Sequence, residues 1–266
     1  YATLQISSIT LQLFLTILFL YFLPCHYRDK NNYLVYFSIV SGLLILIRGE
    51  FIFFYLFTII YFYLFKKKEF LKIFVSILLT VMVISPYLYR NYNHFNTFVL
   101  TKSFGYNLLK GNNPSKIVEG NARFVEKEYD KKKLNIKTDS KYEIKLDDFY
   151  RDRAIEFIKN DPLVYLKFYF QKIFSLLFLD FNSSYPNYFN IFHILPKALI
   201  SISSFIGGIL VLKNRGIYQY LSLYYFLNIL LFSLFFILPR YSLIFLPVQI
   251  LLSMEFFKYL NRRLFN

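Results

Sequence analysis

The chain has 266 residues, a mean hydropathy of +0.41 and a hydrophobic fraction of 56%. Repeated apolar runs of roughly membrane-spanning length argue against an ordinary soluble domain. The net charge of +15 at pH 7 does not indicate a nucleic-acid-binding protein, because most of the excess positive charge is scattered at the ends of apolar runs and is not gathered on one exposed face.

The charged residues are distributed as the positive-inside rule predicts for a membrane protein. Eleven of the 16 acidic residues lie between Arg90 and Pro162, where fifteen basic residues leave a segment charge of only +4. Most other basic residues stand at the ends of apolar runs. The single cysteine, Cys25, excludes an intrachain disulfide framework. Since the sequence begins within an apolar run, without an initiator Met or a signal-peptide pattern, we expect it to lack the N-terminus of its parent protein.

The first 65 residues contain two apolar blocks. Residues 3–24 have about the length of a membrane span. The second block, 33–65, is too long for one ordinary span and is interrupted by Arg48-Gly49-Glu50. Each half has about 15 residues, so we expect a tight helical hairpin or a pair of shortened helices.

A further span is expected at 71–89, ending at Pro86 and Arg90. Placing Lys66–Lys68 on the cytoplasmic side directs this span outward, so that the polar segment 90–162 is extracytoplasmic. That segment is long enough to be translocated whatever its charge. The chain is therefore expected to be a multi-pass protein of the plasma (inner) membrane.

The end of the polar segment has helical features. Phe149, Ile155 and Ile158 are expected to share a partly apolar helix face. The sequence Asn160-Asp161-Pro162 predicts the end of this helix and the start of another, with Asp161 as its N-cap and Pro162 at its first position. The apolar run 162–179 carries a polar stripe that includes Lys167 and Gln171, four residues apart. We expect this helix to lie in the membrane interface and not to cross.

Three more spans complete the expected topology. Residues 195–212 run inward, 217–238 outward and 242–260 inward. The predicted fold class is all-α: a polytopic transmembrane helix bundle with one long extracytoplasmic loop and an interfacial helix. The corresponding divisions are the transmembrane helices of 1–89, the loop 90–162, and the interfacial and C-terminal helices of 163–266.

Two arginines near the ends of the N-terminal spans are candidates for binding an anionic lipid group. Arg48 sits between two apolar half-blocks, where a charge is costly enough to indicate function, although a local Arg48–Glu50 pair capping a hairpin explains it equally well. Arg90 has a guanidinium that suits a bidentate clamp on phosphate oxygens. Its alternative role is an interface anchor beside Tyr87 and Tyr89.

The segment Gly105-Tyr-Asn-Leu-Leu-Lys-Gly-Asn-Asn-Pro114 is rich in the residues of tight turns. Its side chains could hydrogen-bond sugar hydroxyls or order a loop over a cleft, and an ordinary surface turn is the plain alternative. The candidate substrate residues in this loop are Tyr106, Asn107, Lys110, Asn112 and Asn113.

Arg240 opens the last apolar run within Pro239-Arg240-Tyr241, either as a phosphate ligand or as a snorkelling arginine at the interface. The histidines are far apart in the sequence and have no metal-ligand spacing, so no metal or other cofactor is identified.

Five segments together resemble the GT-C superfamily of membrane glycosyltransferases, in the branch of the protein O-mannosyltransferases and the lipid A aminoarabinose transferase. These segments are Gly42–Arg48, Pro86–Asn91, Gly105–Pro114, Ala154–Pro162 and Arg240–Pro247. The resemblance implies transfer of a sugar from a polyprenyl-phosphate carrier to a glycan, lipid or protein acceptor, with inversion, at the outer face of the membrane. It also implies arginines at the lipid phosphate and a carboxylate base in a loop that would precede residue 1.

For that reason no catalytic residue is assigned, and we expect the fragment alone to be inactive. The alternative functions are a lipid-carrier flippase or membrane transporter, and a structural subunit of an envelope assembly. A transporter would be expected to show breaks at mid-membrane or two halves of matched hydropathy, whereas the breaks here lie at helix ends.

Overall fold

The computed structural model describes residues 8–27, 31–65, 70–129, 136, 138–214 and 216–265. All regular elements in these residues are helical, which confirms the predicted all-α class. Within these residues, three helical stretches are long and apolar enough to cross a membrane: Phe70–Phe95, Ile191–Val211 and Pro239–Leu264. The chain divides into two compact units, Tyr1–Leu100 and Thr101–Asn266, and each is described by itself.

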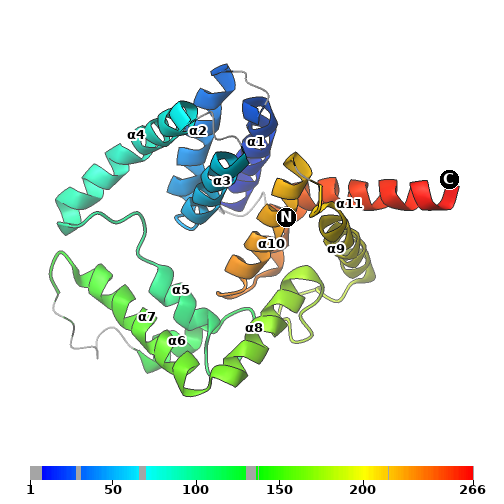
Figure 1. The fold of residues 1–266 in the computed structure, drawn as a ribbon. Helices are drawn as coiled ribbons and strands as arrows, with labels where there is room; N and C mark the ends of the chain where they lie inside the picture. Colours follow the sequence, from blue (N-terminus) through cyan, green and yellow to red (C-terminus); the bar gives the residue numbers. More distant parts are fainter. Residues whose placement is uncertain are drawn as a thin grey trace. The chain divides into compact units, whose positions relative to one another are not determined.

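Unit 1 consists of α1 (Ile9–Tyr27), α2 (Asn31–Ile47), α3 (Phe51–Phe65) and α4 (Phe70–Phe95) (Figure 1). The predicted interruption at Arg48-Gly49-Glu50 is confirmed, because it forms the turn between α2, of 17 residues, and α3, of 15 residues. The basic cluster Lys66–Lys68, on which the orientation was argued, lies outside the described residues.

Buried polar side chains join three helices of unit 1 at one level. Ser38 Oγ of α2 lies 2.9 Å from Ser76 Oγ of α4, and Thr80 Oγ1 donates to the Oη of Tyr55, on α3, at 3.1 Å. Further along, Gly42 of α2 packs against Val83 of α4. Because residue numbers rise together on α2 and α4, these two helices are parallel. Small and hydroxyl-bearing residues of this kind let membrane helices approach closely and hydrogen-bond across the interface.

The helix α4 does not end at Pro86 and Arg90 as the sequence had predicted, but continues to Phe95. A proline inside a helix removes the N–H that would bond the carbonyl four residues earlier, here that of Met82. The Oγ of Ser85 donates to this carbonyl at 3.0 Å. The hydroxyl thus satisfies the group that Pro86 releases, and the helix passes through the proline.

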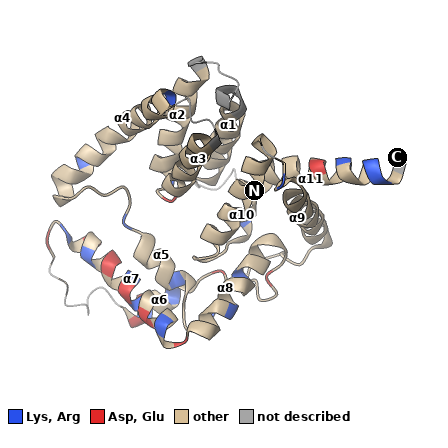
Figure 2. Ribbon diagram, viewed as in Figure 1, with Lys and Arg blue, Asp and Glu red and all other residues tan. Residues whose placement is uncertain are grey.

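Unit 2 begins with three helices, and the acidic and basic residues of the second and third stand out in Figure 2. They are α5 (Phe104–Gly111), α6 (Ala122–Glu128) and α7 (Tyr142–Asn160). Their core is formed by Leu109, Val125, Leu146, Tyr150 and Ala154. Phe149 of the predicted apolar face packs against this core, but the face as a whole is not the buried one. Ile155 of that face is exposed, because α7 turns the face with Leu146, Tyr150 and Ala154 toward α5.

The remaining helices of unit 2 are α8 (Pro162–Leu177), α9 (Ile191–Val211), α10 (Ile217–Phe232) and α11 (Ser242–Phe265), with the short 3-10 helix η2 (Pro239–Tyr241) before α11. The predicted junction is confirmed, since α7 ends at Asn160 and α8 begins at Pro162, although the Asp161 side chain makes no capping hydrogen bond.

The last three helices alternate in direction. Ser204 and Gly208 of α9 bond to Tyr225 and Ser222 of α10, so α9 and α10 are antiparallel. Gln249 of α11 bonds to Tyr225 of α10, and Phe245 packs against Phe232 further along α10, so α10 and α11 are antiparallel. It follows that α9 and α11 are parallel.

The expected span 217–238 is wrong at its end, because α10 stops at Phe232 after 16 residues. The following residues, 233–238, form an irregular connection to η2, which we call the α10–α11 connection. Its backbone bonds to other parts of unit 2: Ile237 N donates to Val118 O at 2.8 Å, and Leu234 O accepts from Asn112 Nδ2 at 3.0 Å. These partners take the place of the hydrogen bonds that a longer helix would have made.

Candidate functional site

Arg48 lies in the turn between α2 and α3, where it forms the hairpin pair considered from the sequence. Its Nη1 donates to Glu50 Oε1 at 3.0 Å, and its carbonyl accepts from Phe51 N at 2.9 Å. Both side chains of the pair are partly exposed. The pair therefore helps to close the turn, and a lipid-phosphate role for Arg48 stays a prediction.

Arg90 is exposed on α4, beyond Pro86. Its Nη1 donates to Asn91 Oδ1 at 3.3 Å, while the buried Asn91 donates to Val99 O at 2.7 Å. Since α2 and α4 are parallel, Arg48 and Arg90 both lie toward the C-terminal ends of their helices, at one end of unit 1. Arg240 belongs to unit 2, so the convergence of all three arginines stays a prediction.

The segment Gly105–Pro114 is not a turn throughout, as its composition had indicated: residues 104–111 form the helix α5. The tertiary contacts that favour the helix come from α7. Asp147 Oδ1 accepts from Tyr106 N at 3.0 Å and so satisfies an amide of the first helical turn, which Ser103, the N-cap, does not bond with its side chain. Leu109 is fully buried in the core formed with α6 and α7.

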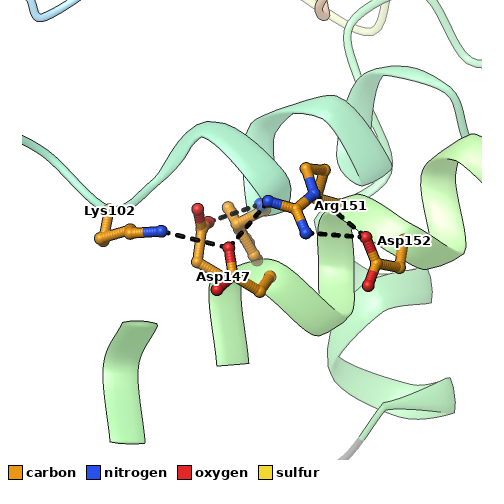
Figure 3. Close-up of polar contacts among 6 residues, drawn as sticks. Lys102, Asp147, Arg151 and Asp152 are labelled. Carbon is orange, nitrogen blue, oxygen red and sulfur yellow. Dashed lines mark hydrogen bonds and ion pairs between the residues drawn. The ribbon is translucent and has the colours of Figure 1, made fainter. Parts of the chain in front are cut away.

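Charged residues fasten the start of α5 to α7, as Figure 3 shows. Lys102 Nζ lies 3.1 Å from Asp148 Oδ1, which also receives Arg151 Nη1 at 2.9 Å. The guanidinium of Arg151 also bonds Asp152 at 3.0 Å. Because these side chains are partly exposed at the surface, each ion pair contributes at most about 1 kcal/mol.

The side chains of the two asparagines after α5 hold the neighbouring backbone in place through hydrogen bonds. Asn112 Nδ2 donates to Leu108 O at 2.9 Å and Leu234 O at 3.0 Å. Asn113 bonds Lys110 O and Ile117 O through Nδ2 and accepts from Ile117 N through Oδ1. Both residues are buried. The sequence suggested two functions for these side chains, hydrogen bonding to a sugar and ordering of the loop. The contacts described here order the loop. Contact of Tyr106, Asn107, Asn112 or Asn113 with a sugar stays a prediction.

A fully buried ammonium, that of Lys172 on α8, joins three segments of unit 2. Its Nζ donates to Asn112 Oδ1 at 3.0 Å and to Gly111 O and Leu234 O at 3.3 Å each. The ring of Phe168 lies 4.9 Å from the same nitrogen. Burial lowers the pKa of Lys172 to about 7, because an apolar environment disfavours the charged form. We call this arrangement the Lys172 clamp.

The approach of α5 to the α10–α11 connection requires a glycine at position 111. A Cβ on Gly111 would lie 2.5 Å from the backbone of Phe235 and Phe236, closer than real contacts allow. The absence of a side chain lets the Gly111 carbonyl reach Lys172 Nζ. This glycine is therefore part of the Lys172 clamp.

Two cations, Lys110 and Arg240, belong to or follow the segments that the Lys172 clamp joins. The Nζ of Lys110, in the last turn of α5, lies 4.0 Å from the centre of the Phe236 ring. The pKa of Lys110 is lowered, first by burial and then by the positive charge of Arg240, while Glu126 acts in the opposite direction. The Nε of Arg240 is buried and has no hydrogen-bond partner. Neighbouring positive charges form a suitable environment for an anion.

A buried carboxylate, that of Glu119, connects the loop before α6 with the loop after α8. Glu119 accepts from the Oγ of Ser183, from Ser184 N at 3.2 Å and from Ser184 Oγ at 2.6 Å. Asp180, also buried, has its pKa raised by burial, with a smaller contribution from the negative charge of Glu119. Every bond of Glu119 serves to hold the loop after α8 against the loop before α6. Across the described residues, no group of three or more His, Cys, Asp or Glu side chains could hold a metal.

The buried cluster around Lys172 and Glu119 was not predicted from the sequence. Lys172 is a cation within an apolar run, and this was a signal for a special environment. The predicted polar stripe of the helix, however, rested on Lys167 and Gln171. In the structure Lys167 and Gln171 are exposed and Lys172 is buried. No family model matches the chain, and no curated protein or solved structure matches it.

Proposed function

We propose that the whole protein is an integral multi-pass glycosyltransferase of the inner membrane. It moves a sugar from a polyprenyl-phosphate carrier to a glycan, lipid or protein acceptor at the extracytoplasmic face. The membrane component rests on the three apolar helices of spanning length. The expected partners are membrane lipids, the lipid-linked sugar and the acceptor, and no nucleic acid.

One observation carries the proposal. Gly105–Pro114 and Arg240–Pro247 are two of the segments on which the resemblance to the GT-C superfamily rests, and the first contacts the α10–α11 connection that leads to the second. The Nζ of Lys110, in the first segment, lies 4.0 Å from the centre of the Phe236 ring, four residues before Arg240. Asn112, in the first segment, is bonded to Leu234 in the connection that leads to Arg240. A chance match of short motifs would not require segments so far apart in sequence to pack together.

The chemistry requires cations at the leaving group. An acceptor oxygen forms a bond to the anomeric carbon while the bond from that carbon to the phosphate oxygen breaks. The lipid phosphate leaves with a negative charge, and the acceptor proton passes to a base, for which a carboxylate is suited. Fixed cations that face the departing phosphate stabilise the charge that develops in the transition state. The Lys110–Arg240 pair supplies such cations, and we assign no residue as the base.

The test is transfer by the whole protein in proteoliposomes that contain a polyprenyl-phosphate sugar labelled in the sugar. A transferase labels an added acceptor and releases polyprenyl phosphate in equal amounts. A flippase would move the intact lipid between leaflets and leave the sugar–phosphate bond unbroken. Lipid movement without transfer to any of the three acceptor classes would contradict the proposal and favour the flippase.

A further inference from the structure

We infer that the loop between α8 and α9, together with the outward face of α8, binds a lipid bilayer at the depth of its head groups. Residues 178–190 form this loop, which we call the α8–α9 loop. The polar stripe of 162–179 led to the expectation of an interfacial helix, but the sequence assigned no role to the loop that follows. The inference rests on the apolar surface that these residues expose, and it is independent of sugar transfer.

The outward face of α8 is apolar. Residues three and four apart lie on one face of a helix, and four exposed side chains of α8 follow this spacing. They are Leu163, Leu166, Phe170 and Phe174. The opposite face is packed within unit 2 and includes the buried Phe168 and Lys172. A helix at a water-exposed surface normally presents polar residues on the side away from the core, whereas α8 turns apolar side chains both inward and outward.

The α8–α9 loop continues this apolar stripe. Phe181 is 70% exposed, and its ring stacks on that of Phe174 with the centroids 5.9 Å apart. Further along, Phe189, Ile191 and Phe192 are exposed as well, Phe192 to 85%. A gathering of exposed large apolar side chains in one segment marks an interaction surface.

Charged side chains are almost absent from this surface. From Pro162 to Phe192 the chain carries three of them, and only that of Lys167 is exposed. Lys172 and Asp180 are buried. A lysine beside an apolar stripe can direct its ammonium to the head groups while its methylene chain stays among apolar groups. Covering the stripe with lipid therefore desolvates no other charge of this segment.

The α8–α9 loop is held in one shape by its polar groups. Glu119 accepts from the hydroxyls of Ser183 and Ser184 and so fixes the loop to the loop before α6. The Oη of Tyr188 accepts from Asp180 N at 2.9 Å and closes the loop on itself. These polar groups are used internally, while the large apolar side chains remain outside. Because the loop is preorganised, it loses little conformational freedom when it binds.

The neighbouring helix α9 identifies the partner as lipid. It begins at Ile191 and is long and apolar enough to cross a membrane. The side chains of Leu195, Leu199 and Ile202 are exposed along it. Its exposed apolar surface is continuous in sequence with that of the α8–α9 loop, through Phe192. The start of a span lies at the depth of the head groups, where aromatic residues are enriched. The lipid that surrounds the span therefore also covers the loop and the outward face of α8.

The experiment uses the absence of Trp from the sequence, because a single introduced Trp then reports its own surroundings by fluorescence. The 266-residue chain is reconstituted in bilayers whose lipids carry bromine either near the glycerol end of the acyl chains or near their terminal methyl groups. Bromine quenches a Trp at its own depth. Phe170→Trp and Phe181→Trp should lose more fluorescence to the shallow bromine than to the deep one, since an interfacial face lies about 5–10 Å into the boundary of head groups and acyl chains.

Two matched controls set the scale. Ile202→Trp, exposed midway along α9, should be quenched most by the deep bromine. Ile155→Trp, exposed on the charged helix α7, should be quenched by neither and should emit at a longer wavelength, as Trp does in water. Circular dichroism verifies folding. If a variant does not fold, a nitroxide on a cysteine at the same position, with Cys25→Ser, gives the depth from its collisions with oxygen and with a water-soluble nickel complex.

Emission and quenching of Phe170→Trp or Phe181→Trp like those of Ile155→Trp would overturn the inference, and a protein partner or a second copy of the chain would be the alternative occupant. Stronger quenching of either variant by the deep bromine would also overturn it, because the segment would then cross the membrane. These results are separable from those on the proposed function. Insertion without sugar transfer leaves the lipid surface and removes the transferase, and transfer with both positions in water does the reverse.

Discussion

The Nζ of Lys172 lies 3.0 Å from the Oδ1 of Asn112, sixty residues earlier in the chain. The same ammonium also donates to the carbonyl of Leu234, sixty-two residues later. One buried cation therefore connects α8, the end of α5 and the α10–α11 connection. A buried charge of this kind is tolerated only where acceptors surround it, and Lys172 has three. Its protonation must then be coupled to the stability of the fold.

We predict that stability rises between pH 7 and pH 9 because of Lys172. The pKa of this group is about 7 in the folded chain against an ordinary value of 10.5. Between these two values the unfolded chain binds more protons than the folded one, so the free energy of unfolding increases with pH. The slope from this group is at most about 1.4 kcal/mol per pH unit. Lys172→Met should remove it, as measured by unfolding in mixed micelles with a denaturing detergent.

Lys167→Met is the matched control for this experiment, because Lys167 is on the same helix and exposed. The control should keep the slope of the unchanged chain. If Lys172→Met shows the same pH dependence as Lys167→Met, the ammonium is not titrating in this range and the coupling is contradicted.

We predict that Gly207→Ala destabilises unit 2 far more than Gly208→Ala. A Cβ on Gly207 would lie 2.0 Å from Leu252 O of α11, so the backbones of α9 and α11 would have to separate. A Cβ on Gly208 meets side-chain atoms no closer than 3.3 Å. Overpacking of a close interface costs about 1–3 kcal/mol, whereas the neighbouring change should cost less than about 1 kcal/mol. Unfolding at one fixed pH measures both, and equal losses would show that α9 and α11 are not in such close contact.

The sequence predicted the helices better than their ends. Long apolar runs and the charged interruption at Arg48-Gly49-Glu50 are local signals, and they gave the all-α class and the α2–α3 turn. The course of α4 through Pro86 depends on one hydroxyl, that of Ser85. The end of α10 at Phe232 depends on partners elsewhere in unit 2. No pattern within a short window contains those contacts.

The candidate site was predictable only in part, for the same reason. Arg240 and Lys110 were identified as separate residues, since each stands in a distinctive local sequence. Their proximity comes from the packing of α5 against the α10–α11 connection, which needs Gly111 and the Lys172 clamp. Glu119 and Asp180 were missed because their burial is produced by loops that meet only in the folded chain.

We predict that Ser115 lies on the extracytoplasmic side of the membrane and Asn214 on the cytoplasmic side. In a chain with Cys25 replaced by Ser, a cysteine at Ser115 should react with an impermeant thiol reagent in intact cells, and one at Asn214 only after lysis. Both positions are exposed, so access of the reagent depends on the side of the membrane. The alternating directions of α9, α10 and α11 are those that the topology requires. Reaction at Asn214 but not at Ser115 in intact cells would contradict the orientation.

The last prediction concerns Arg48, Arg90 and Arg240 in the activity of the whole protein. If they bind one lipid phosphate, Lys at any of these positions keeps the charge but loses the planar fork, so the loss of rate should approach that caused by Ala. We expect a loss of about 10²–10³ in rate for a contact made in the transition state. Full activity of all three Lys variants, at matched expression, would leave the arginines as interface anchors.

Arg48 needs a control of its own, because it is bonded to Glu50. Glu50→Gln removes the charge of the partner and keeps Arg48. If Arg48 serves only the turn between α2 and α3, Glu50→Gln should reduce activity as much as Arg48→Ala does. If Arg48 binds phosphate, Glu50→Gln should retain activity, since the guanidinium itself is unchanged. Comparing these two variants therefore separates the turn-closing role of Arg48 from the phosphate role.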